Sequence, residues 1–206
     1  MRPTFPFRAL LHSIALFLAL FSTAPVAFGD TPSNNTTKII PANSLYQLES
    51  EWKRDDGSAL HLADLRGQTR VLTLFFSHCN NICPMITGQL KTVEREMPAD
   101  LHKRVGFVLV TLDPAGDNAE TLSDYRERMG YSVENWTLLR GSADDTRELA
   151  NLLGVTYMLK QENGQIDHNG LIVVLDTEGR IVEKFAGITD RKAFLALLKK
   201  TARQRR

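Results

Sequence analysis

Residues 70–97 read RVLTLFFSHCNNICPMITGQLKTVEREM, and two patterns meet within this stretch. Its first residues, RVLTLFF, are an apolar run typical of a strand that is buried on both faces of a sheet. From Met85 to Met97 the apolar residues instead follow a near-helical spacing, and Pro84 suits the first position of that helix. A buried strand that leads directly into a helix is the building unit of a parallel α/β sheet.

The alternation of strand and helix continues through the rest of the chain. We expect further strands at 104–113 and 136–139, helices at 118–129 and 143–154, a β-hairpin at 168–187 and a closing amphipathic helix at 191–203. Asp145 is the expected cap of the helix at 143–154, and Gly154 is its expected C-terminal stop. Parallel strands joined by helices and followed by a hairpin predict a three-layer α/β/α domain with a mixed sheet.

The N-terminal region has the pattern of an export signal. Arg2 and Arg8 precede an apolar stretch, and the triplet AFG at 27–29 places small residues where a signal peptidase cleaves. We expect residues 1–29 to be a signal peptide or an uncleaved anchor, followed by a polar spacer at 30–44 and one domain at 45–206. Both forms export the domain, so we expect a periplasmic protein that touches the membrane only through an N-terminal anchor.

The charge balance excludes one class of partner. Without residues 1–29 the chain holds 23 basic and 24 acidic residues, so its net charge is close to zero with neutral histidines. A domain that binds nucleic acid usually carries a clear basic surplus, which this chain lacks. We therefore expect no nucleic-acid partner.

The only cysteines of the chain, Cys79 and Cys83, lie between the first buried strand and the following helix. A disulfide between them would stabilise the fold little, because the benefit of a disulfide grows with the length of the loop that it closes. At a helix start the backbone amides favour anions, so we expect a lowered thiolate pKa and an active pair. The pair is then either a redox couple or two ligands of a metal ion.

A metal site needs a further donor, and His168 at the mouth of the predicted hairpin is the best candidate. Two thiolates and one imidazole suit Cu(I) and are acceptable to Cu(II), whereas zinc usually takes a fourth ligand. Of the other histidines, His12 belongs to the signal segment, and His61 and His102 are expected to be solvated surface residues. His78 precedes Cys79, and its side chain should point away from that cysteine.

Together these features resemble the Sco/SenC family of copper-binding assembly factors of cytochrome c oxidase. The resemblance extends from about Leu45 to the C-terminus. It rests on the apolar strand before Cys79-x-x-x-Cys83-Pro84, on TLDPAGD (111–117), on Asp167-His168 and on LDTEGRIV (175–182). The chain departs from the family pattern at loop positions, with Asn80-Asn81-Ile82 between the cysteines, no threonine and second proline after DPAGD, and Asn169 after His168.

The resemblance implies a thioredoxin-like fold with an extra N-terminal β-hairpin, and one copper ion held by Cys79, Cys83 and His168. It implies a role in maturing the dinuclear copper site of a respiratory oxidase, by copper delivery, by reduction of the site's cysteines, or both. The expected partners are the copper-site subunit of a terminal oxidase and a periplasmic thiol reductant or second copper chaperone. Asp113 and Asp117 either orient metal ligands or contact a partner, or they are a turn residue and a helix cap.

An exported thiol–disulfide oxidoreductase is the alternative function. In that role Cys79 would attack a partner disulfide and Cys83 would resolve the mixed disulfide. Reduction of a partner disulfide in the absence of copper distinguishes this function from copper handling. Peroxidase chemistry at Cys79 alone is disfavoured, because no Pro-x-x-x-Thr sequence precedes this cysteine.

Overall fold

The computed structural model of the chain describes residues 39–80, 82–159 and 165–203. The expected signal segment at 1–29 and residues 30–38 of the expected spacer lie outside these ranges. Within the described ranges, none of the helices is both long and apolar enough to cross a bilayer.

Most of the described strands form one mixed sheet. The strands are β1 (Glu51–Arg54), β2 (Ala59–His61), β3 (Thr69–Phe75), β4 (Val105–Thr111), β5 (Trp136–Arg140), β6 (Tyr157–Leu159), β7 (Ile166–His168), β8 (Ile172–Leu175) and β9 (Ile181–Phe185). A seven-stranded sheet has the order β2-β1-β5-β4-β3-β8-β9. Parallel pairing joins β3 to β4 and β4 to β5, whereas β8 is antiparallel to both β3 and β9. The predicted α/β fold with a mixed sheet is confirmed.

The central strands are mostly apolar because helices cover both faces of the sheet. Every residue of β4 is buried, and in β3 only Arg70 is partly exposed. The helices are α1 (Ile82–Glu96), α2 (Ala99–His102), α3 (Ala119–Met129), α4 (Ala143–Leu153) and α5 (Arg191–Arg203), with short 3₁₀ turns η1 (Leu45–Gln47) and η2 (Leu62–Leu65). The side chains of β3 and β4 therefore form the core of the domain. A functional site can lie only at the ends of these strands, where the chain leaves the sheet.

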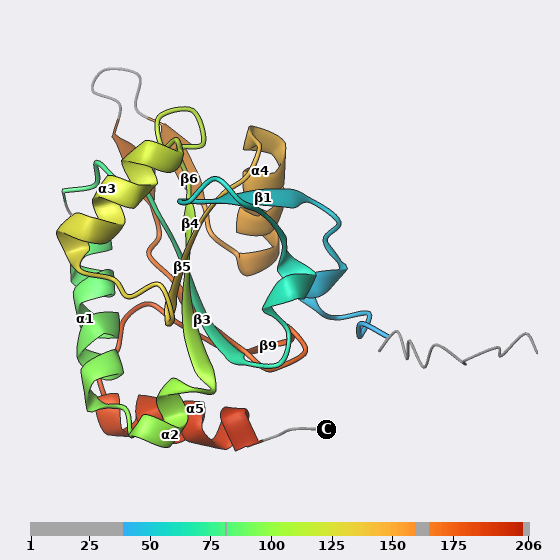
Figure 1. Ribbon diagram of the computed structural model, residues 1–206, viewed down its shortest axis with the longest axis vertical. Helices are drawn as coiled ribbons and strands as arrows, with labels where there is room; N and C mark the ends of the chain where they lie inside the picture. The colour runs from blue at the N-terminus through green and yellow to red at the C-terminus, as the bar shows by residue number, and fades with distance from the viewer. Residues whose placement is uncertain (1–38, 81, 160–164, 204–206) are drawn as a thin grey trace, which may run out of the picture. The chain divides into compact units, whose positions relative to one another are not determined.

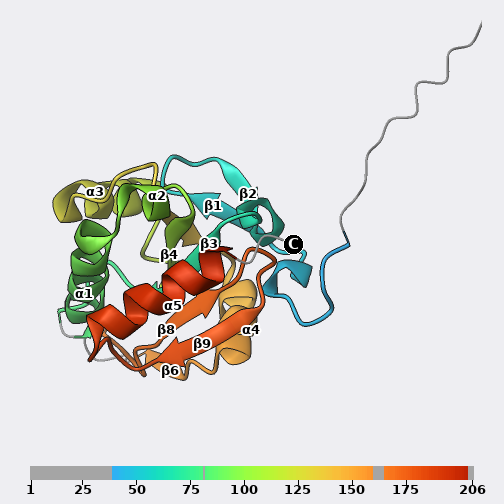
Figure 2. The same ribbon diagram turned by 90° about the horizontal axis from the view of Figure 1, so that it is seen from below.

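The helices lie in layers about the sheet. Figure 1 shows α1 and α3 on one side of the central strands and α4 on the other, which is the predicted three-layer arrangement. Figures 1 and 2 both place α2 and α5 at the end of the sheet where β4 begins. The opposite end, where the parallel strands finish, carries the loop with the cysteines, as expected for the working edge of such a sheet.

The short strands β6 and β7 form a separate two-stranded antiparallel ribbon that the sequence analysis did not predict. His168 was expected to open the C-terminal hairpin, and this placement was wrong. It is the last residue of β7, whereas the hairpin strand β8 begins at Ile172. Strands of three residues are too short to show a periodic pattern, so no periodic signal marks the ribbon in the sequence.

Two helix boundaries differ from the prediction. The cap of α4 is Ser142, whose hydroxyl accepts a hydrogen bond from the Asp145 N–H, while Asp145 bonds back to Ser142 in a capping box. Gly154 ends α4 in the left-handed conformation, as predicted. The helix α1 begins at Ile82, before Pro84, and Pro84 still lies in the first turn, where a missing N–H costs nothing.

Candidate metal site

The cysteine loop begins where β3 ends, and a buried carboxylate fixes its start. Asp117 is fully buried and accepts hydrogen bonds from the Ser77 N–H at 3.0 Å, from the Ser77 hydroxyl and from the Thr111 hydroxyl. Because Ser77 follows β3 and Thr111 ends β4, the carboxylate ties the ends of these two strands together. Asp117 therefore holds the backbone just before Cys79.

The loop then turns into α1 and brings the two cysteines together. The Cys79 N–H donates to the Phe76 carbonyl at 3.1 Å, which closes a turn, and the Cys83 N–H reaches the Cys79 sulfur at 3.5 Å. Cys79 is half-buried, whereas Cys83 in the first turn of α1 is buried. As a whole residue, Cys79 is therefore the less buried of the two cysteines.

The ribbon of β6 and β7 carries His168 to the cysteines, and Asn169 anchors it. The side-chain oxygen of Asn169 accepts a hydrogen bond from the Thr156 N–H at 2.7 Å, and its amide donates to the Gly154 carbonyl at 3.1 Å. Both partners follow the end of α4. The residue that departs from the family pattern thus fixes the position of His168 relative to α4.

Gly170 allows the same segment to approach α1 closely. A Cβ atom at this position would lie 2.4 Å from Cδ1 of Ile86 and 2.7 Å from Cδ1 of Ile82, which is far inside van der Waals contact. Only glycine therefore fits against the first turns of α1 without a shift. This contact brings the end of β7 to the helix turn that holds Cys83.

The three predicted ligand residues converge. The sulfur atoms of Cys79 and Cys83 and a ring nitrogen of His168 all lie within 4.8 Å of one another, and Nε2 of His168 is 3.4 Å from the Cys83 sulfur. Thiolate and imidazole ligands bond to a metal ion at about 2.0 to 2.3 Å, which places the ligand atoms roughly 3.5 to 4 Å apart. The donor set and its spacing therefore fit one metal ion.

Burial shifts the pKa values of two of these groups. Burial and the hydrogen bond with Cys79 raise the pKa of the Cys83 thiol well above its usual range. The expectation of a lowered thiolate pKa was therefore wrong for Cys83, because desolvation outweighs the helix start. Burial also lowers the pKa of His168, opposed by the charge of Asp167. His168 is thus neutral near pH 7 and able to donate a nitrogen lone pair to a metal ion.

The remaining histidines of the domain lie outside this cluster. His61 is exposed on β2, as predicted. His78 is exposed, and its Nδ1 lies 2.8 Å from the Ser77 hydroxyl. His102 was expected to be solvated, but it is half-buried and its Nδ1 contacts the Asn135 side-chain amide at 3.2 Å. The cluster formed from the described residues contains His168 alone among the histidines.

The two aspartates of the TLDPAGD segment have different roles. Asp113 is a turn residue, whose carboxylate accepts a hydrogen bond from the Gly116 N–H at 2.9 Å. Asp117 does not cap α3, because Asn118 does so by accepting from the Thr121 N–H. Asp117 instead supports the loop before Cys79. Sequence reasoning missed its partner Ser77, since a serine after a strand carries no signal of its own.

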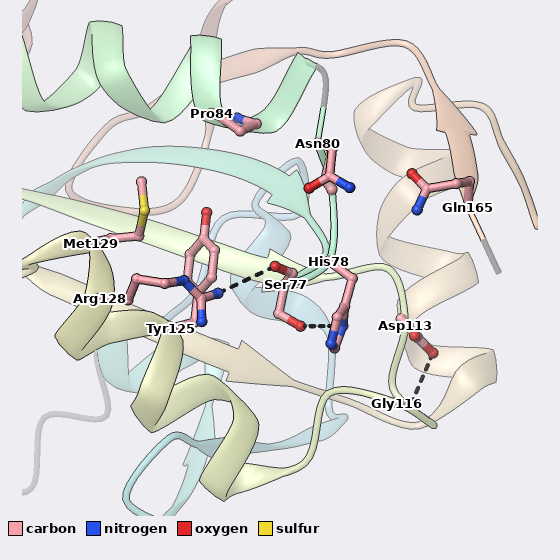
Figure 3. A pocket seen from close by; sticks show the side chains of 11 residues that line it. Ser77, His78, Asn80, Pro84, Asp113, Gly116, Tyr125, Arg128, Met129 and Gln165 are labelled. Atoms are coloured by element: carbon pink, nitrogen blue, oxygen red, sulfur yellow. Dashed lines mark hydrogen bonds between the residues drawn. The ribbon is translucent and has the colours of Figure 1, made fainter. Parts of the chain in front are cut away.

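A cavity of about 760 Å³ opens beside Cys79 (Figure 3). Its wall includes His78 and Asn80 from the cysteine loop, Asp113 from the turn after β4, and Arg128 and Met129 from the last turn of α3. A second cavity of about 550 Å³ is lined by residues of the ribbon, including His168. Cys79 therefore lies in the wall of the first cavity and His168 in the wall of the second.

Comparison with known proteins gives a matching family model and several curated relatives. A family model described as SCO1/SenC matches residues 44–203. A SCO1 protein homolog from Bacillus subtilis (strain 168) is 22% identical over 146 residues, which are 69% of this chain and 75% of that relative. The chain spans about half the length of the next two curated relatives, with 57% and 40% of them covered.

Solved structures agree with this fold. A SCO1/SenC family lipoprotein from Bacillus anthracis str. Ames is 25% identical, with a TM-score of 0.68 and coverage of 79% of this chain and 97% of that chain. Bradyrhizobium japonicum ScoI with copper bound is 22% identical, with a TM-score of 0.63 and coverage of 74% and 96%. Since the family model matches nearly all of the described residues, the chain belongs to the SCO1/SenC family.

Proposed function

We propose that this protein binds one copper ion through Cys79, Cys83 and His168 and passes it to a partner protein. The observation that carries the proposal is the convergence of two sulfur atoms and one imidazole nitrogen within 4.8 Å of one another. Thiolates are soft ligands that favour Cu(I), and the imidazole also suits Cu(II). The copper in the related Bradyrhizobium structure supports the choice of metal.

The positions of the ligands support transfer as well as binding. Cys79 and His168 are partly exposed and each lines a cavity, so a ligand of a partner can approach the metal from solvent. Cys83 is buried and keeps the metal attached to the domain while the other ligands exchange. Because the Cys83 thiol has a raised pKa, copper must displace its proton on binding.

A copper titration tests the proposal. The reduced protein is titrated with Cu(I) in the presence of a competing chelator, and Cys79→Ser is treated in the same way. We expect one tightly held equivalent in the parent protein and loss of that binding in the variant. Intact thiols with no copper retained against the chelator would rule out a copper carrier.

Within this proposal, the recipient is the dinuclear copper site of a respiratory oxidase. We propose that the copper-site subunit of that oxidase is the main partner, and that a periplasmic thiol reductant or another copper chaperone acts on the same cysteines. The family resemblance of the cysteine loop and the Asp167-His168 segment supports this role. Incubation of the copper-loaded protein with the apo subunit tests it, since the spectrum of a dinuclear copper centre should develop.

The proposed site of action is the periplasm. The sequence pattern of residues 1–29 supports export, through a cleaved signal or as an anchor, with residues 30–44 as a spacer before the domain at 45–206. The Bacillus anthracis relative is a lipoprotein, which agrees with an exported family member. Fractionation of cells that express the full chain, together with the mass of the exported protein, tests both export and cleavage.

A second function, thiol–disulfide exchange, is favoured by the unequal burial of the two cysteines. Cys79 is half-buried and borders a cavity, as an attacking thiol requires, while Cys83 is buried behind it, as a resolving thiol requires. We therefore propose that the reduced pair also reduces partner cysteines. Reduction of an oxidised copper-site peptide without copper, lost in Cys79→Ser, is the expected result. Equal reduction by Cys79→Ser would exclude this activity of the pair.

A further inference from the structure

Arg128 is held beside the cysteine loop by a ring contact and by one hydrogen bond to described residues. Its guanidinium lies over the ring of Tyr125, 5.2 Å from the ring centroid. Nη2 donates to the Ser77 carbonyl at 3.5 Å, just before Cys79 in the chain (Figure 3). Both supports have contacts of their own, because Tyr125 is buried against Phe75 and Ser77 is hydrogen-bonded to Asp117.

Arg128 differs from its helix neighbour Arg126 in its charge partners. Among the described residues no ion pair involves Arg128, whereas Arg126 in the same helix is paired with Asp55. Among the described residues that line the cavity, Asp113 is the only acidic one, and its carboxylate accepts a hydrogen bond from the Gly116 N–H. Figure 3 shows Asp113 at the other end of the cavity from Arg128. Within the described part of the chain, the guanidinium therefore faces the cavity without a charge partner.

The cavity has the size and lining of a recognition site. Its volume of about 760 Å³ is within the range of pockets that bind small ligands or side chains. Pro84, Tyr125 and Met129 form an apolar part of the wall next to Arg128, and Cys79 is also part of the wall. An acidic side chain fits this combination, because its methylene groups can lie on the apolar wall while its carboxylate accepts two hydrogen bonds from the planar guanidinium.

We propose that Arg128 recognises an acidic side chain of the partner protein, in the segment that presents a thiol or metal ligand to Cys79. The inference rests on the proposed function, since exchange at Cys79 requires a partner segment in this cavity. It adds the chemical character of that segment: a cysteine with aspartate or glutamate close to it in space. Arg128 acts by positioning the segment and does not touch the exchanging atoms.

The test measures thiol exchange without copper. A short peptide with one cysteine flanked by aspartates is activated as its 2-pyridyl disulfide, and a matched peptide carries asparagines instead. The Cys79 thiolate attacks the peptide sulfur, the bond to the pyridyl sulfur breaks, and pyridine-2-thione leaves with the electron pair and takes up a proton. Cys83 then attacks Cys79 and releases the peptide thiol, so that one Cys79–Cys83 disulfide forms for each peptide.

We expect the parent protein to react about two- to five-fold faster with the acidic peptide than with the neutral one, the effect of one partly exposed ion pair. Arg128→Gln should lower this ratio to about one while the rate with the neutral peptide stays at the parent value. Arg147→Gln is the matched control, because it removes the same charge from an exposed pair on α4, outside the cavity wall, and should keep the parent ratio.

Other outcomes overturn the proposal. A parent protein without preference for the acidic peptide contradicts it, as does an unchanged ratio in Arg128→Gln. If both rates fall together in Arg128→Gln, Arg128 acts on Cys79 itself and the proposal is also wrong. The copper titration is independent of this assay. A charge preference in a protein that fails to retain copper would therefore contradict the copper function and leave the recognition of an acidic segment standing.

Discussion

The Cys83 sulfur lies 3.4 Å from Nε2 of His168, although 85 positions separate the two residues in the chain. One residue belongs to the first turn of α1 and the other ends β7, so the contact depends on how the ribbon of β6 and β7 is fastened to the rest of the domain. Asn169 holds the ribbon through hydrogen bonds to the residues that follow α4, and Gly170 allows it to pack closely on α1. The third donor is thus placed by tertiary contacts that can be altered one at a time.

Removal of the imidazole should affect the two oxidation states of copper differently. In His168→Ala we expect the affinity for Cu(II) to fall by more than about 100-fold, since loss of a residue that merely supports a ligand costs about 10- to 100-fold. Cu(I) should be affected less, because two thiolates can still hold it. Competition with chelators specific for each oxidation state measures both values.

His61→Ala is the control for this substitution, because His61 is exposed on β2 and lies outside the cluster. Its affinity for both oxidation states should equal that of the parent protein. A parent-like affinity of His168→Ala for Cu(II) would remove His168 from the site.

Gly170→Ala should disturb the site without changing any ligand. The added methyl group would lie 2.4 Å from Cδ1 of the buried Ile86, so the isoleucine side chains, the ribbon or the helix must shift. We expect a loss of about 1–3 kcal/mol in the free energy of unfolding, as for overpacking elsewhere, together with weaker Cu(II) binding. Urea unfolding and chelator competition measure the two effects.

Gly88→Ala is a matched control on the exposed side of α1, where an added Cβ meets nothing within 4 Å. This variant should be more stable than the parent by about 0.5–1 kcal/mol, because alanine has the higher helix propensity. If both alanine variants gave the same stability and copper affinity, the close approach at Gly170 would have no part in placing His168.

The sequence allowed prediction of the sheet, because long apolar runs such as those of β3 and β4 identify strands buried on both faces. The position of both cysteines was also predicted from the sequence, since a pair after such a strand lies at the edge where parallel strands finish. His168 was chosen for its place before an apolar strand, and its true element, β7, was missed. Three-residue strands are too short for a periodic signal, so local sequence does not reveal them.

The residues that support the site could not be predicted for a different reason. The role of Asp117 depends on Ser77, forty positions earlier, and on Thr111, and neither partner is marked by local pattern. The high pKa of the Cys83 thiol follows from burial, which a helix start does not reveal. For both Asp117 and Cys83, the sequence does not reveal which residues surround the side chain in the folded protein.

Asp117→Asn tests the anchor of the cysteine loop. An asparagine offers one oxygen in place of a carboxylate that accepts three hydrogen bonds, and its amide group would face donors that it cannot satisfy. We expect a loss of about 2–3 kcal/mol in the free energy of unfolding, together with weaker Cu(I) binding. Asp144→Asn, at a carboxylate that is 89% exposed, should change stability by less than about 0.5 kcal/mol. A parent-like stability of Asp117→Asn would show that the buried carboxylate does not hold the loop.

The stability of the reduced, metal-free protein should fall in mild acid, and His168 should account for part of the fall. Burial lowers the pKa of His168 in the folded protein, whereas in the unfolded chain the pKa is about 6.5. As the pH falls below that value, the unfolded chain takes up a proton that the folded protein still refuses, so the free energy of unfolding decreases until the folded pKa is reached. His168→Gln has no titrating group at this position and should lose less stability over the same interval. Urea midpoints of both proteins at about pH 7.5 and about pH 5.5 measure the difference, and the acidic groups that they share cancel in the comparison. Equal decreases in the two proteins would mean that the imidazole titrates in the folded state as it does in the unfolded chain, and that the cluster does not keep His168 neutral for a metal ion.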